Sequence, residues 1–211
     1  MPVTLEWQTG TDVQIRPVVL ALAAGAGLSS GAALAISIIA DRPLWLASTF
    51  VFFPGLVALA GMSVIAGRSR QELFLERLRA GLIAGALAIA CYDISRWAVE
   101  APGLVNSDTF RAIAIFGTGL TGFPPDAAPA IAAGWAFHIC NGLGFAVAYM
   151  FVAAGRRWPW GVAYALALEG AMVALYPGWL GFSLTTEFLT VSILGHLAYG
   201  TVLGVAAERQ R

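Results

Sequence analysis

Residues 21–40 read ALAAGAGLSSGAALAISIIA, a run of twenty positions without a charged side chain. A helix needs about 20 apolar residues to cross the roughly 30 Å hydrocarbon layer of a membrane. A strand of a membrane barrel would alternate apolar and polar residues over about ten positions, and this run does not alternate. Since no water in the bilayer interior can satisfy an open backbone, the run predicts a membrane-spanning helix.

The composition of the whole chain agrees with this interpretation. Of its 211 residues, 59% are hydrophobic and only 11% are charged, whereas soluble domains carry about 25% charged residues. The formal net charge is zero, and nucleic-acid binding depends mainly on contacts of Lys and Arg with phosphate. The sequence therefore predicts an integral membrane protein in contact with the lipid bilayer, without a nucleic-acid partner.

Six segments of the chain are long and apolar enough, or nearly so, to span a bilayer. We therefore predict an all-α, polytopic membrane protein with six transmembrane helices. If the N-terminus is inside, nine of the twelve Arg residues fall in inner segments, so the positive-inside rule favours both termini inside. The segments are approximately residues 17–40, 43–67, 80–98, 129–154, 160–178 and 184–206.

These segments divide the chain into two parts and a short tail. Residues 1–79 hold an N-terminal tail, two transmembrane helices and an inner loop. Residues 80–206 form a four-helix membrane core with a long outer loop at residues 99–128, and residues 207–211 form an inner tail. Residues 1–16 lack the cationic start of a cleavable signal peptide, so we expect the first segment to remain in the mature protein.

The outer loop contains one stretch with apolar residues at helical spacing, SDTFRAIAIFGTG. Ser107 or Asp108 at its start can cap a helix. We expect a short helix at the outer surface that ends before Pro124. It is either an interfacial spacer or a lid over whatever the bundle encloses.

The last four segments contain a duplicated two-helix hairpin. The second segment of each hairpin carries one His followed by Gly one turn later, in His138–Gly142 and His196–Gly200. Both hairpins would run from the inside to the outside and back, so they would be parallel repeats.

Four ionisable side chains lie inside the predicted spans, where such groups are rare and usually functional. The helical rise of 1.5 Å per residue puts all four in the outer half or at the centre of the bilayer. If the hairpins pack as a four-helix bundle, the groups can converge on one interior pocket, which Asn141 could complete. They are Asp93, His138, Glu169 and His196.

Each of these side chains also has a structural interpretation. Asp93 could pair with Arg96, and Arg96 with Glu100, each about one turn along the helix. Each His could be a neutral hydrogen-bonding group between helices. Glu169 is harder to explain, because no cation lies within one turn of it and a buried carboxylate must be protonated, partnered or bound to an ion.

Three chemistries could use this set. A metal such as Zn, Fe or Mn could take His138, His196, Glu169 and Asp93 as ligands. A b-type haem could take the two His as axial ligands, and protons or ions could pass from Asp93 through a His to Glu169. We therefore expect a membrane protein that binds a metal ion, haem or protons in an outer pocket, with Asn141 as a further lining residue.

Two other functions remain open. Three GxxxG patterns allow close approach of helices, either within the bundle or in a homo-oligomer, so the chain could be an accessory or scaffold subunit of a larger membrane complex. It could instead be a membrane enzyme acting on a lipid-soluble substrate, although no Ser lies in a recognisable nucleophile motif. The patterns are Gly27–Gly31, Gly81–Gly85 and Gly200–Gly204.

Three stretches of the last four segments resemble uncharacterised bacterial inner-membrane families of the YagU-like type. They are GLIAGALAIACYDISRW, AAGWAFHICNGLGFAVAY and SILGHLAYGTVLG. The resemblance covers roughly residues 80–206 and implies a location in the bacterial inner membrane, but no agreed activity. It also implies that Asp93, His138 and His196 belong to a recurring pattern from which Glu169 departs.

Overall fold

The computed structural model describes residues 17–68, 71–105, 108, 110–180 and 185–210, and within these ranges it contains helices and no strands. The predicted all-α class is confirmed. The expectations for residues 1–16, for Ser107 and for the start of the sixth segment at 184 lie outside the described residues. The elements are α1 (Pro17–Gly27), α2 (Ser29–Ile39), α3 (Leu44–Ala47), the π-helical η1 (Ser48–Phe52), α4 (Phe53–Arg68), α5 (Glu72–Glu100), α6 (Arg111–Thr121), α7 (Ala128–Ala153), α8 (Pro159–Leu180) and α9 (Thr186–Glu208).

Three helical stretches are long and apolar enough to cross a membrane: Leu44–Arg68, Ala128–Ala153 and Thr186–Glu208. A fourth candidate is the pair α1 and α2, if its two helices, bent by 55° at the break, form one span. Helices also cover the remaining two predicted segments, as α5 and α8. Because charged residues are spread along α5, it is the least apolar of the long helices. Six spans therefore remain a prediction.

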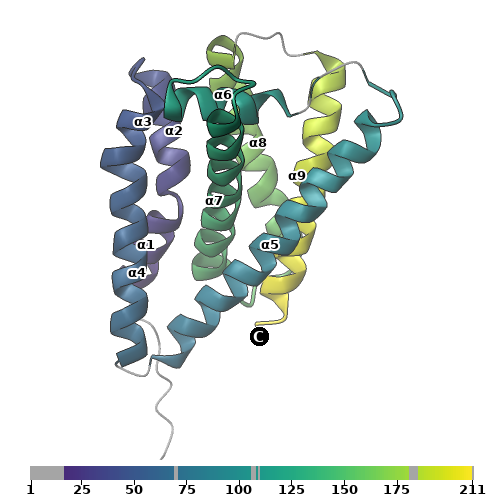
Figure 1. Ribbon diagram of the computed structural model, residues 1–211. Helices are drawn as coiled ribbons and strands as arrows, with labels where there is room; N and C mark the ends of the chain where they lie inside the picture. The colour runs from purple at the N-terminus through teal and green to yellow at the C-terminus, as the bar shows by residue number, and fades with distance from the viewer. Residues whose placement is uncertain (1–16, 69–70, 106–107, 109, 181–184, 211) are drawn as a thin grey trace, which may run out of the picture.

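The long helices run alternately up and down (Figure 1). The start of α1 and the end of α9 lie at the same end of the bundle, while α6 lies across the opposite end, over α7. Helix α7 is central, since it contacts α1, α2, α5, α6 and α9. This arrangement puts the two predicted hairpins, α5 with α7 and α8 with α9, side by side through the contact of α5 with α9.

Two local features interrupt the first pair of spans. The chain bends between α1 and α2 beside Ser29, whose hydroxyl donates to the carbonyl of Ala26 at 2.7 Å. A π-helical segment, η1, precedes Pro54. Proline has no N–H to donate to the carbonyl four residues earlier, and the wider π-helical turn lies directly before this missing donor.

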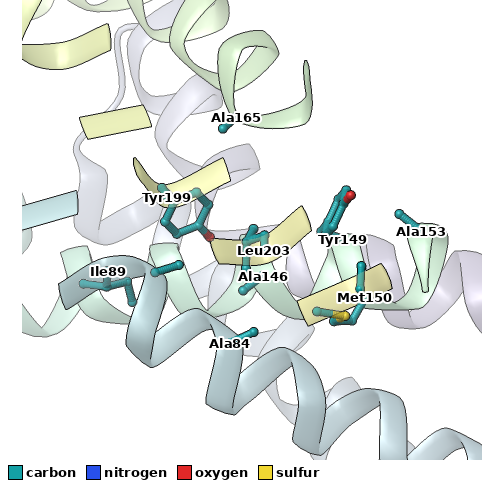
Figure 2. Packing of buried hydrophobic residues seen from close by; sticks show 11 residues of the cluster. Ala84, Ile89, Ala146, Tyr149, Met150, Ala153, Ala165, Tyr199 and Leu203 are labelled. Atoms are coloured by element: carbon teal, nitrogen blue, oxygen red, sulfur yellow. The ribbon is translucent and has the colours of Figure 1, made fainter. Parts of the chain in front are cut away.

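The core lies where α5, α7 and α9 pack against one another (Figure 2). Met150 and Leu203 are fully buried there, and Ala84 and Ala146 lie beside them. The small residues permit this approach. A Cβ on Gly81 would lie 2.8 Å from the Cα of Val147.

The other GxxxG patterns also pack within the chain. A Cβ on Gly27 would lie 2.6 Å from the carbonyl oxygen of Gly144 on α7, and one on Gly200 would lie 2.6 Å from that of Gly161 on α8. The interpretation of these patterns as close packing within the bundle is confirmed.

The predicted helix of the outer loop is α6. It ends at Gly122, which has a φ of +73°, a conformation that glycine adopts without strain. Asp108 accepts a hydrogen bond from the backbone N–H of Phe110 at 3.0 Å, so it orders the turn before the helix and does not cap its first N–H groups. Ile113 and Phe116 are buried, which turns one face of α6 toward the bundle.

Candidate functional site

The bundle encloses a cavity of about 350 Å³, which we call the chamber. Helices α2, α5, α6, α7, α8 and α9 all contribute to its walls. Most of its lining is apolar, which is usual for a site that binds a small molecule. The polar or aromatic-polar members of the lining are Tyr92, Arg96, His138, Asn141, Tyr176, Ser192, His196 and Tyr199.

The first pair of predicted site residues joins α5 to α7. His138 Nε2 lies 3.1 Å from Asp93 Oδ1 and 3.2 Å from Oδ2. Since an ionised carboxylate only accepts hydrogen bonds, Nε2 is the donor, and a neutral His138 keeps its bare nitrogen at Nδ1. Asp93 forms no ion pair with the described side chain of Arg96, so the structural interpretation that joined these two residues is wrong.

The second pair joins α8 to α9 and is more deeply buried. His196 Nδ1 lies 2.9 Å from Glu169 Oε2 and 3.0 Å from the carbonyl oxygen of Ser192. The Ser192 hydroxyl donates to the same Oε2 at 2.8 Å. Because a carbonyl oxygen can only accept, Nδ1 carries a proton, and a neutral His196 keeps its bare nitrogen at Nε2.

Tyr92 packs against the His of both pairs. Its ring centroid lies 6.0 Å from that of His138 and 5.1 Å from that of His196, edge to face in the second case. Arg96, one turn further along α5, places its guanidinium 4.8 Å from the centroid of Tyr92 and 4.9 Å from that of Phe110. Such cation–π contacts stabilise a cation away from water, and Arg96 is only 6% exposed.

Asn141 lies on the chamber wall and joins α7 to α2, because its Oδ1 accepts a hydrogen bond from Ser30 Oγ at 2.8 Å. The sequence predicted Asn141 as a lining residue but gave no sign of Ser30, which lies 111 residues away. It also missed Tyr92. The i to i+4 spacing of Tyr92 and Arg96 puts them on one helix face, and that spacing is the signal that could have found them.

The two predicted hairpins therefore each carry a carboxylate–histidine pair, with different geometry. In each, the first helix supplies a carboxylate and the second supplies a His, but His138 uses Nε2 and His196 uses Nδ1. Both His line one chamber. The four groups form two separate pairs, and the described part of the chain holds no group of three or more His, Cys, Asp or Glu side chains arranged for a metal ion.

Residues 75–211 match a family of unknown function, DUF6789. The chain belongs to this family. The DUF6789 region contains α5 from residue 75 onward, α6 to α9 and both carboxylate–histidine pairs, while α2, with Ser30, lies before it. The prediction of an uncharacterised family over the last four segments is confirmed, whereas its YagU-like character stays a prediction. Neither the curated proteins nor the solved structures gave a match to this chain.

Proposed function

We propose that this DUF6789 protein spans the bacterial inner membrane six times, with both termini inside, and binds one exchangeable proton in its chamber on the two carboxylate–histidine pairs. Six helical segments support this topology, as do the start of α1 and the end of α9 at the same end of the bundle (Figure 1). The surplus of Arg at that end gives the orientation.

The topology can be tested at two exposed arginines. Arg42 lies between α2 and α3, and Arg157 lies between α7 and α8. Cysteines introduced by Arg42→Cys and Arg157→Cys should react with a membrane-impermeant maleimide from opposite sides of sealed vesicles, above the background of the native chain. Labelling of both from the same side would contradict the proposed orientation.

The observation that supports proton binding is the charge of the chamber. Neither Asp93 nor Glu169 lines the chamber, but each contacts a His that does. With both carboxylates ionised, they and the cation of Arg96 leave one net negative charge when both His are neutral. An unbalanced charge away from water is costly, and one proton on either imidazole removes it. Helices α2 and α6 add no ionisable side chain to the lining, and α8 and α9 add otherwise only the tyrosines.

The two pairs suit the holding of an exchangeable proton. Histidine changes charge near physiological pH more readily than other side chains, and a carboxylate beside each ring stabilises its imidazolium. Glu169 Oε1 is buried without a hydrogen-bond partner, so Oε2 alone carries the contacts with His196 and Ser192. Removal of one carboxylate leaves one negative charge to balance the cation of Arg96, so a proton on either His is no longer required for neutrality.

The test uses the fact that the chain contains only two His. Labelling with ¹⁵N-histidine and NMR in nanodiscs reports both rings, and we expect one imidazolium per chain near neutral pH. Asp93→Asn removes one chamber charge and should abolish that signal. Glu76→Gln, which removes an exposed carboxylate from the same helix, should leave it unchanged. An imidazolium that persists in Asp93→Asn would overturn the proposal.

The geometry gives less support to the metal and haem alternatives. Each His does keep one nitrogen outside its pair, and metal-bound His usually donates its other N–H to a carboxylate or carbonyl. However, the ring of Tyr92 packs against both His rings, and the described residues hold no group of three or more His, Cys, Asp or Glu side chains arranged for a metal ion. The appearance of a Soret band after addition of hemin would favour haem over a proton alone.

A further inference from the structure

A second cavity of about 350 Å³ lies next to the chamber and shares the lining residue Leu28 with it. This cavity, which we call the groove, lies between α1, α7 and α8 toward the end of the bundle that carries the C-terminus. Its lining is apolar apart from the tyrosine hydroxyls. It consists of Ala24, Leu28, Ala148, Tyr149, Val152, Ala153, Trp160, Ala163 and Tyr164.

The two cavities open at the side of the bundle, between α2 and α8. Leu28 is 37% exposed, and Ala32 on α2 and Ala171 on α8 are exposed although both line the chamber. In a membrane-spanning bundle this side faces the acyl chains. A ligand that enters here comes from the lipid phase and not from water.

The chamber offers polar contacts from His138, His196 and Arg96. Neutral His138 and His196 present bare nitrogens, which accept hydrogen bonds, and each becomes a donor when protonated. Arg96 is buried beside them, and its Nε has no hydrogen-bond partner. The aromatic rings of Tyr92, Phe116 and other lining residues provide flat apolar contacts in the same chamber.

We propose that the chamber and the groove together bind an isoprenoid quinone or its quinol, with the ring in the chamber and the start of the aliphatic tail in the groove. The two ring oxygens of such a molecule lie on opposite sides of a flat ring, and either can meet the free nitrogen of a His that lines the chamber. The hydroxyls of the quinol donate to bare imidazoles, and a carbonyl of the quinone accepts from a protonated one. This inference rests on the proposed function, because it uses the same exchangeable proton.

A fatty acid is the other lipid-soluble ligand that these cavities suggest, since its carboxylate could meet Arg96. The chamber lining carries the rings of Tyr92, Phe116, Phe145 and Tyr176. These flat aromatic walls match a ring better than a chain. We therefore favour the quinone, and palmitate serves as the competing probe.

The test measures equilibrium binding of a benzoquinone with a decyl tail to the purified full chain in nanodiscs. Ala171→Trp places an indole in the chamber wall, and Ala174→Trp is its matched control, because Ala174 is also exposed on α8 but lines neither cavity. We expect a Kd raised about tenfold or more in Ala171→Trp and unchanged in Ala174→Trp. Equal binding by the two variants, or displacement of the quinone by equimolar palmitate, overturns the inference.

A second pair of variants tests the groove. Ala163→Trp should weaken binding of the decyl compound but not of the same ring without its tail, and Ala167→Trp, at an exposed position outside both linings, should affect neither. Equal effects of Ala163→Trp on the two compounds would refute the placement of the tail. If the chamber variants behave as expected but Asp93→Asn keeps its imidazolium, the proposed proton site fails while the quinone site stands. If Asp93→Asn loses its imidazolium but the two chamber variants bind the quinone equally, only the quinone site is rejected.

Discussion

Replacement of His196 with Leu removes the partner of a carboxylate that is only 4% exposed. Glu169 then keeps one hydrogen bond, from Ser192, and loses the contact at 2.9 Å with His196. Removal of one member of a buried ion pair costs about 3–5 kcal/mol, because the remaining charge is left without compensation. We therefore expect His196→Leu to lower the free energy of unfolding by about this amount.

The double variant Glu169→Leu with His196→Leu removes both charged groups and should be the more stable of the two. Replacement of a buried pair by apolar residues of similar volume is often neutral or stabilising. Here Ser192 also loses its acceptor, which costs about 1–2 kcal/mol. The expected order of stability is wild type, then the double variant, then His196→Leu.

The Asp93–His138 pair is the internal control. Its side chains are 20% and 15% exposed, against 6% and 11% for Glu169 and His196, so solvent screens it more strongly. We expect His138→Leu to cost about 1–2 kcal/mol, less than the change at His196.

The assay is reversible unfolding of the full chain in mixed micelles with increasing SDS, followed by circular dichroism. If His196→Leu costs no more than His138→Leu, or no more than the double variant, then the burial of the second pair does not determine its energy and the reasoning fails.

Two further predictions concern the tautomers and the packing glycines. In ¹⁵N-histidine NMR, the neutral form of His138 should carry its proton on Nε2 and that of His196 on Nδ1, and the same tautomer at both sites would contradict the hydrogen bonds described. Gly81→Val should cost about 1–3 kcal/mol or more, because its side chain would overlap the backbone of α7. Gly61→Val, with nothing within 4 Å of the added Cβ, should have little effect in the same SDS unfolding measurement.

The sequence predicts the helices well because their length and apolarity are local properties. The run at residues 21–40 indicates a helical span directly. The bend of 55° within it could be suspected only from its Gly and Ser residues. Pro54 marked the second interruption, but the π-helical turn that precedes it depends on how the surrounding helix accommodates the missing donor.

The partners of the polar groups were less predictable, because they depend on how the helices cross. Local spacing offered Arg96 as the partner of Asp93, whereas the structure joins Asp93 to His138, 45 residues away. Arg96 lies instead against the rings of Tyr92 and Phe110. Spacing along one helix indicates the contact of Arg96 with Tyr92. It gives neither the Asp93–His138 pair nor the contact of Arg96 with Phe110, since these require the relative rotation of α5, α6 and α7.

The order of small and large residues along each helix explains why the chamber lies where it does. Gly81 and Ala84 near the start of α5, and Gly200 near the end of α9, lie toward one end of the bundle and bring the helices into contact there. Toward the other end of the same helices, Tyr92 on α5 and His196 on α9 line the chamber. The chamber wall in that half is formed by aromatic and hydrogen-bonding groups. Substitutions in the glycine half should change mainly stability, whereas substitutions in the other half should change mainly what the chamber binds.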